Sequence, residues 1–174
     1  SIAITFACME AAASSTPSTN AASNASTGIG ETLRVKVVLL TGTVGVGKST
    51  VGFSVAERAG NSGTPAGFID VDQLSRLWPA PAGDPFRDEL IFTNLRAIAP
   101  NYRAAGASLL VLAWVIEDAT DVVRLETALD APVTVLRLVS PPEVVAARLH
   151  RRHQGPESSG LAWHLDRAPQ LAAI

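Results

Sequence analysis

Short hydrophobic runs alternate along this chain with segments of helical spacing. Four runs have the length and the β-branched content of buried strands, namely 35–40, 67–71, 107–116 and 133–139. Helical patterns follow them at 49–59, 84–99 and 120–129, then from Ser140 to before Gly155, and finally from Ser158 or Ser159 onward. Strands that alternate with helices predict an α/β fold with a four-stranded parallel sheet and helices on both faces.

Two of these helices have recognisable starts. Asp84 and Pro85 predict an N-cap followed by proline in the first turn, and that helix is expected to end at about Ala99, before Pro100. The sequence Ser-Pro-Pro-Glu at 140–143 predicts a capping box, with the serine as N-cap and the glutamate closing it.

The first 33 residues differ in composition from the rest. After a short apolar stretch they consist mostly of Ala, Ser, Thr, Asn and Gly, and their only charges are Glu10 and Glu31. Such a segment has too little apolar surface to offset the entropy of ordering, so 1–33 is expected to be a flexible tail and 34–174 the folded domain. A secretory signal is disfavoured because the apolar stretch is short and no basic region precedes it.

Composition excludes several classes of protein. The 174 residues are 47% hydrophobic and carry a net charge of −2, which disfavours nucleic-acid binding. No apolar run is long enough for a membrane span. The single cysteine, Cys8, excludes an internal disulfide, and the three histidines are expected to be solvent-exposed rather than metal ligands. A cytoplasmic protein without membrane or nucleic-acid partners is expected; its oligomeric state is left open.

The segment 42–50 carries the clearest chemistry. It has two glycines separated by four residues, Gly42 and Gly47, and the second begins Gly-Lys-Ser, between a predicted strand and a predicted helix. Glycines let the backbone curl so that N–H groups point at a phosphate, and the helix N-terminus adds positive potential. Lys48 would reach the β- and γ-phosphates, and the Ser49 hydroxyl would bind Mg²⁺. The candidate nucleotide-binding residues are Gly42, Thr43, Val44, Gly45, Val46, Gly47, Lys48, Ser49 and Thr50.

Acidic residues follow two predicted strands. Alternation along an extended segment would place Asp70 and Asp72 on one side, facing the same crevice as the loop. One carboxylate could order the Mg²⁺ shell while the other accepts a proton from an attacking hydroxyl; a solvated strand end is the alternative. Glu117 and Asp118 end the third strand, where an acid could serve Mg²⁺ or water, or could cap the next helix.

The loop, its Ser-Thr-Val-Gly continuation and the Asp-x-Asp after the second strand resemble the small P-loop kinases of the nucleoside-monophosphate-kinase-like group. That group includes shikimate, gluconate and adenylylsulfate kinases and chloramphenicol phosphotransferase. The segments 71–79, 84–90 and 94–107 resemble an actinobacterial group of kinase-like ATP-binding proteins. The resemblance covers about 35–174.

The resemblance implies roles for particular residues. Asp72 would be the base or acceptor ligand and Asp70 the acid beside the metal, while 148–160 would form a lid whose Arg148 and Arg152 neutralise the transferred phosphoryl group. It also implies strand order 2-3-1-4-5. The fifth strand is not found in this sequence, so phosphate is expected to bind better than purine.

Together these features predict a kinase that uses ATP and Mg²⁺ to phosphorylate a small hydroxyl-bearing acceptor that the sequence does not identify. Two alternatives stay open. One is an ATPase or regulatory module in which Glu117 or Asp118 positions water, and the other is an inactive anion-binding fragment. Arg96 and the segment 101–103 are candidates for the acceptor pocket, with Trp78 and Phe86 as its cover.

Overall fold

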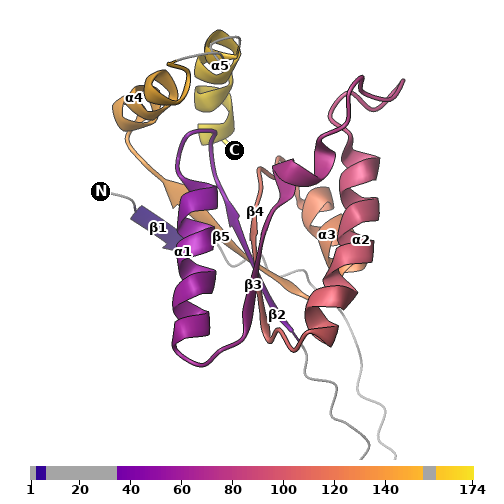
Figure 1. The fold of residues 1–174 in the computed structure, drawn as a ribbon. Helices are drawn as coiled ribbons and strands as arrows, with labels where there is room; N and C mark the ends of the chain where they lie inside the picture. The colour runs from indigo at the N-terminus through magenta and orange to yellow at the C-terminus, as the bar shows by residue number, and fades with distance from the viewer. Residues whose placement is uncertain (1–2, 7–34, 155–159) are drawn as a thin grey trace, which may run out of the picture.

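The computed structural model of the chain describes residues 3–6, 35–154 and 160–174 (Figure 1). In chain order its elements are β1 (Ala3–Phe6), β2 (Lys36–Thr41), α1 (Lys48–Asn61), β3 (Ala66–Asp70), the 3₁₀ helix η1 (Val71–Ser75), α2 (Asp88–Ala104), β4 (Leu109–Ala113), α3 (Ala119–Leu129), β5 (Val133–Val139), α4 (Pro142–Arg152) and α5 (Leu161–Ala172).

The sheet has the order β1-β5-β2-β4-β3. Strands β5, β2, β4 and β3 are parallel to one another, which confirms the predicted four-stranded parallel sheet and its order 2-3-1-4. Parallel strands all end at the same edge of a sheet, so the loops that follow β2, β3 and β4 share one end of the molecule. That edge carries the chemistry described below.

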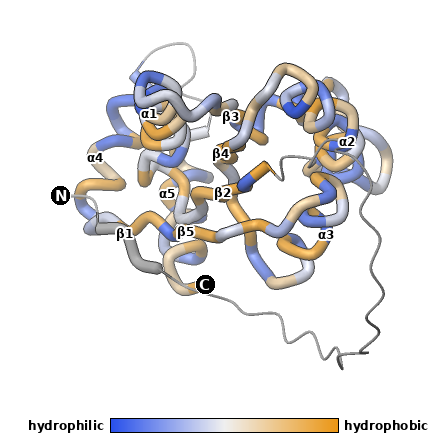
Figure 2. The backbone as a smooth tube through the Cα atoms, turned by 90° about the horizontal axis from the view of Figure 1, so that it is seen from below, coloured by the Kyte–Doolittle hydropathy of each residue, from blue (hydrophilic) through white to orange (hydrophobic). Residues whose placement is uncertain are grey.

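Helices cover both faces of the sheet (Figure 1). On one face α1 packs over Leu40 and Val111, and on the other α2 and α3 enclose a larger core that includes Phe92, Leu95 and Leu125. Figure 2 shows the most hydrophobic residues along the strands and on the helix surfaces that face them. Helices α4 and α5 pack against each other beyond the carboxyl edge of β2, around buried Leu149.

An N-terminal strand is the main departure from the predicted architecture. Within the segment expected to be a flexible tail, Ala3–Phe6 forms β1 and pairs antiparallel with β5, Phe6 opposite Leu136. An unpaired sheet edge offers free N–H and C=O groups, and a stretch rich in Ile, Thr and Phe suits such an edge. The strand lies on the edge where the resemblance would place a fifth strand. Residues 7–33 of the expected tail lie outside the described part.

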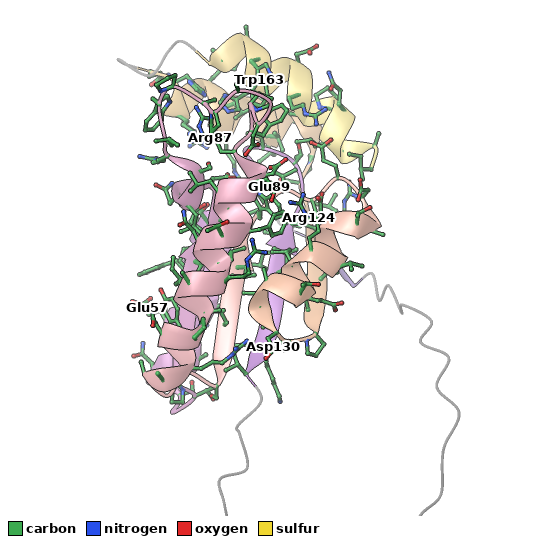
Figure 3. The ribbon with its side chains drawn as sticks, turned by 90° about the vertical axis from the view of Figure 1, so that its right-hand side faces the viewer. Glu57, Arg87, Glu89, Arg124, Asp130 and Trp163 are labelled. Carbon is green, nitrogen blue, oxygen red and sulfur yellow. The ribbon has the colours of Figure 1, made fainter. Side chains whose placement is uncertain are left out.

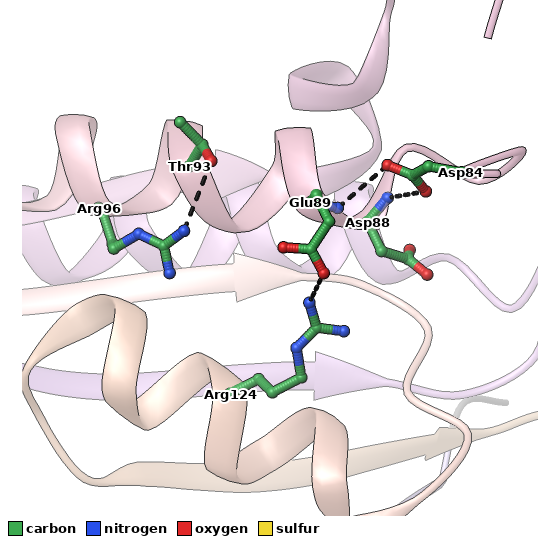
Figure 4. Close-up of polar contacts among 6 residues, drawn as sticks. All are labelled: Asp84, Asp88, Glu89, Thr93, Arg96 and Arg124. Carbon is green, nitrogen blue, oxygen red and sulfur yellow. Dashed lines mark hydrogen bonds and ion pairs between the residues drawn. The ribbon is translucent and has the colours of Figure 1, made fainter. Parts of the chain in front are cut away.

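Helix α2 differs from its predicted bounds at both ends. It begins at Asp88 rather than near Asp84, because Arg87 is left-handed with φ 62°. Asp84 nevertheless caps the helix: its carboxylate accepts hydrogen bonds from the backbone N–H groups of Asp88 at 2.8 Å and Glu89 at 3.2 Å (Figure 4). The helix continues past Pro100 to Ala104. Packing of Ala99 and Tyr102 on the core outweighs the hydrogen bond that proline cannot donate.

The predicted capping box at Ser140 is wrong. Pro141 is the N-cap, and its carbonyl accepts from the backbone N–H groups of Val144 and Val145. Because Pro142 follows it, Pro141 is kept out of the helical region, with ψ 140°, and the helix starts one residue later. The Ser140 hydroxyl is buried and forms no hydrogen bond with the described residues.

The last helix begins at Leu161, later than expected; the predicted start at Ser158 or Ser159 lies outside the described residues. Within the described ranges, no helix is both long and apolar enough to cross a membrane.

Candidate functional site

The glycine-rich loop connects β2 to α1, as predicted. Gly42 and Gly47 adopt φ values of 129° and 108°, which side chains rarely allow. A Cβ on Gly42 would lie 2.4 Å from the carbonyl oxygen of Leu138 on β5. The loop can therefore approach β5 only with glycine at this position, and the curl that turns its backbone inward depends on that approach.

Lys48, the first residue of α1, folds back over the loop. Its Nζ donates hydrogen bonds to the carbonyl oxygens of Gly42 at 2.9 Å and Thr43 at 3.1 Å. Burial lowers the Lys48 pKa to about 8, against the raising effect of the Asp72 and Asp70 carboxylates, and Arg152 lowers it slightly further. The ammonium is thus held over the glycine-rich loop, in surroundings that disfavour its charged form.

Two of the candidate nucleotide-binding residues are built into the protein interior. Thr43 is buried, and its hydroxyl donates to the carbonyl oxygen of Ala168 on α5 at 2.7 Å. The Val46 side chain is fully buried, and its carbonyl accepts from Nη1 of Arg148 at 2.7 Å. These residues shape the loop and anchor α4 and α5 to it.

A cavity of about 520 Å³ opens beside the loop. It is lined by loop and α1 residues, by one residue each from η1 and the segment after β4, and by α4: Val44, Gly45, Gly47, Lys48, Ser49, Thr50, Val51, Asp72, Val115, Arg148, Leu149 and Arg152. The structure therefore brings Lys48, Ser49, Asp72 and both predicted arginines together. Gly42, Thr43, Val46 and Asp70 are not part of this wall.

The two acidic residues after β3 are placed differently from the prediction. The strand ends at Asp70, and Asp72 lies in the 3₁₀ helix η1, so the two carboxylates do not alternate along an extended segment. Asp72 keeps access to solvent at the cavity mouth. Surrounding protein atoms still desolvate its carboxyl and raise its pKa, an effect strengthened by Asp70 and opposed by Lys48 and Arg152.

Asp72 also lines a second cavity of about 520 Å³, which shares Val44 and Val115 with the first. Its other walls come from segments distant in the chain: Ser75, Phe86, Arg87, Asp88, Ile91, Trp114, Glu117, Asp121, Trp163, His164, Arg167 and Leu171. Figure 3 shows Arg87 and Trp163, from the loop before α2 and from α5, at the same end of the molecule, and Asp130 at the other end. The two cavities therefore have Val44, Asp72 and Val115 in common.

The residues expected to form an acceptor pocket do not come together at the second cavity. Phe86 lines it, but Trp78, Arg96 and the segment 101–103 do not. Tyr102 instead packs against the backbone of Gly67, where an added Cβ would lie 2.5 Å from its ring. Trp163 and Arg167 on α5 line the cavity, although nothing in the sequence pattern marks them as part of a site.

The two acidic residues after β4, Glu117 and Asp118, make different contacts. Asp118 caps α3, as one of the two interpretations had it: its carboxylate accepts from the backbone N–H groups of Thr120 at 2.7 Å and Asp121 at 3.3 Å. Hydrogen bonds from Thr120 and Asp121 lower the Asp118 pKa. Glu117 lines the second cavity and forms an ion pair with Arg167.

His153 and His164 are less exposed than predicted. His153 is buried, and its ring lies 4.9 Å from that of His164 on α5. Burial lowers the pKa of His164, which favours its neutral form. Within the described ranges, no group of three or more His, Cys, Asp or Glu side chains is arranged to hold a metal ion.

No protein-family model matches the sequence, and no curated protein matches it. Solved structures do share its fold. A sugar kinase from Janibacter sp. HTCC2649 has a TM-score of 0.53 and 23% identity, over 77% of this chain and 78% of that one. The tunicamycin resistance protein of Deinococcus radiodurans has a TM-score of 0.51 and 23% identity, over 79% and 80%. The chain thus shares the fold of these structures, a parallel sheet of order 2-3-1-4 enclosed by helices.

Proposed function

We propose that this protein is a small-molecule kinase that transfers the γ-phosphoryl group of ATP to a hydroxyl-bearing acceptor. The observation that carries the proposal is the meeting of two cavities at Asp72, one walled mainly by the glycine-rich loop and α1, and the other containing only Val44 from that loop. Phosphoryl transfer requires a donor and an acceptor held in line, and two pockets that share a carboxylate would suit that requirement.

The donor side binds the nucleotide phosphates. The loop N–H groups and Lys48 would hold the β- and γ-phosphates, with Arg148 and Arg152 neutralising charge on the transferred group. Arg148 already donates to the loop through the Val46 carbonyl, so its guanidinium is positioned at the cavity wall before any ligand arrives.

Two oxygen ligands suited to Mg²⁺ lie near the loop, one in the wall of the first cavity and one outside that wall. The Ser49 hydroxyl lines the first cavity, and the Asp70 carboxylate lies close enough to affect Lys48 electrostatically. These residues fit Mg²⁺, and we assign Ser49 and Asp70 to it. When bound, the ion would neutralise charge on the β- and γ-phosphate oxygens.

Asp72 would orient the acceptor hydroxyl and receive its proton. Its raised pKa suits this exchange, because a carboxylate that holds a proton more readily is a better base. No described residue donates a hydrogen bond to the Asp72 side chain, so its oxygens are available to a hydroxyl group from the second cavity.

Calorimetric titration of Mg·ATP tests the donor site. Wild-type protein is expected to bind it, and Lys48→Ala is expected to lose most of that binding. The chain offers a matched control, because Lys36 is its only other lysine and is exposed on β2, away from both cavities. Loss of binding in Lys36→Ala as well, or binding that survives Lys48→Ala, would contradict the proposal.

Turnover separates the kinase from the alternative ATPase. A kinase releases ADP only when a hydroxyl compound is added, whereas a water-activating ATPase does so without one. The Glu117 carboxylate is already paired with Arg167, which favours the kinase. ADP release at an unchanged rate with and without every hydroxyl compound of a panel of sugars and polyols would favour the ATPase.

A further inference from the structure

The wall of the second cavity is rich in carboxylates. Asp72, Asp88, Glu117 and Asp121 line it, against only two guanidinium groups, those of Arg87 and Arg167. If the proposed function holds, this cavity receives the acceptor, and its charge selects what can enter. The inference below rests on that function and narrows the acceptor to a chemical class.

Both guanidinium groups are already engaged by the protein. Arg167 pairs with Glu117 and donates to Gln170 at 2.8 Å. Arg87 donates to the carbonyl oxygens of Leu77 at 2.5 Å and Pro85 at 3.2 Å. An acceptor carboxylate would have to displace these contacts before it could be bound by either arginine.

Unlike the two guanidinium groups, the Asp88 carboxylate is not engaged by a described residue. Its backbone N–H binds Asp84, but no described residue donates a hydrogen bond to its side chain, whereas the neighbouring Glu89 carboxylate meets Arg124 at 2.6 Å (Figure 4). Desolvation and the nearby Asp84 carboxylate raise the Asp88 pKa. A cation bound in the cavity would stabilise the ionised Asp88 carboxylate and so lower its pKa again.

Aromatic rings complete the same wall. Phe86 and Trp163 are 69% and 57% exposed, although large aromatic side chains are usually covered, and Trp114 lies deeper at 8%. The face of an aromatic ring attracts ammonium groups as well as apolar ring and chain surfaces. Carboxylates and aromatic faces therefore favour the same kind of ligand.

We propose that the acceptor carries a positively charged amine in addition to its hydroxyl group, and that Asp88 binds this amine in the second cavity while Asp72 holds the hydroxyl. The amine lies against the aromatic wall that Trp163 and Phe86 provide. Compounds that present a carboxylate in its place are excluded by the acidic residues around it.

Three probes that differ at one end test the charge preference: glucamine, sorbitol and gluconate share a polyhydroxylated carbon chain and end in an ammonium, a neutral alcohol and a carboxylate. Tryptophan fluorescence reports binding without turnover, since Trp114 and Trp163 line the cavity. Glucamine is expected to bind about tenfold more tightly than gluconate, with sorbitol between them, as expected for one charge-assisted contact.

Asp88→Asn should reduce the advantage of glucamine over gluconate about fivefold or more, because it keeps the shape of the side chain and removes its charge. Glu89→Gln is the matched control: it removes a carboxylate from the same helical turn but not from the cavity wall, and should change the preference less than about twofold. Equal or tighter binding of gluconate, no binding of any probe, or equal effects of the two variants would overturn the inference.

The ATP titration separates this outcome from the proposed function. ATP binding without a preference for glucamine would leave the kinase standing and reject the amine-bearing acceptor. A preference for glucamine without ATP binding would reject the kinase and leave a cation-binding cavity.

Discussion

Proton uptake on nucleotide binding is the most direct consequence of the Lys48 environment. In the free protein burial lowers the Lys48 pKa from 10.5 to about 8. At about 1.4 kcal/mol per pKa unit, this corresponds to a cost of about 3 kcal/mol for keeping the ammonium charged in the loop. Phosphate oxygens beside the ammonium would offset that cost by stabilising the charged form. The Lys48 pKa should therefore rise again when ATP binds.

The size of the uptake follows from the pKa. If bound ATP restores the Lys48 pKa to its ordinary range, binding takes up about 0.1 proton per site at pH 7, about 0.5 at pH 8 and about 0.9 at pH 9. Above pH 8 the affinity should then fall by up to about tenfold per pH unit. Phosphate groups titrate near pH 6, below this window, and do not contribute to the change.

Calorimetry in two buffers with different ionisation enthalpies measures this uptake directly. The difference between the apparent binding enthalpies, divided by the difference between the buffer enthalpies, gives the protons taken up per ATP. Lys48→Arg is the control variant, because arginine keeps its charge throughout the range and should bind without uptake. Tight binding with no proton uptake between pH 8 and pH 9 in the wild-type protein would refute the reasoning.

The same pKa predicts how the free protein responds to pH. The unfolded chain holds the Lys48 proton up to about pH 10.5 and the folded protein only up to about pH 8, so between these values the unfolded state binds more protons. Stability contributed by this group therefore rises with pH across that window and is lowest below pH 8. Urea unfolding of wild-type protein and Lys48→Arg at pH 7 and pH 9 measures it, and the wild type should gain more stability than the variant.

Three further predictions concern single residues. Gly42→Ala should destabilise the protein by about 3 kcal/mol or more in urea unfolding, because the added Cβ would lie 2.4 Å from a backbone carbonyl oxygen. Gly60→Ala is the control: no atom lies within 4 Å of its added Cβ, so it should be neutral or stabilising by up to about 1 kcal/mol. Equal effects of the two variants would contradict this prediction. Asp72→Asn should lower kcat by about a hundredfold or more while Mg·ATP binds as tightly as before or more tightly, and an unchanged kcat would remove Asp72 from the mechanism. Arg152→Gln should change the free energy of unfolding by less than about 0.5 kcal/mol, because no described residue accepts a hydrogen bond from the Arg152 side chain. Its kcat should fall about tenfold or more. A loss of stability without a change in kcat would assign Arg152 a structural role.

The fold was predictable where its signals are local or periodic. The four buried runs became parallel strands because a strand covered on both faces is apolar along its whole length, and no other element of that length has this pattern. Tertiary contacts decided the rest. Pro100 was expected to end a helix, but the packing of Ala99 and Tyr102 against the core holds the helix beyond it. The pairing of Ala3–Phe6 with β5 joins segments more than a hundred residues apart, and no local pattern specifies such a pairing.

The two cavities differ in how far a sequence can reveal them. The first is built around one continuous motif, because a glycine loop followed by a helix forms its phosphate cradle from successive backbone groups. The second gathers side chains from η1, the turn before α2, the segment after β4 and helix α5. Its shape depends on features such as the left-handed Arg87 and the placement of α5 against the loop through Thr43. Asp72 belongs to both cavities. Of its neighbours in the second cavity, the sequence indicated Phe86 and Glu117 but not Asp88 or Trp163. A motif search therefore finds the glycine-rich loop of such a protein, whereas the ligand of the second cavity must be inferred from charges that only the folded chain brings together.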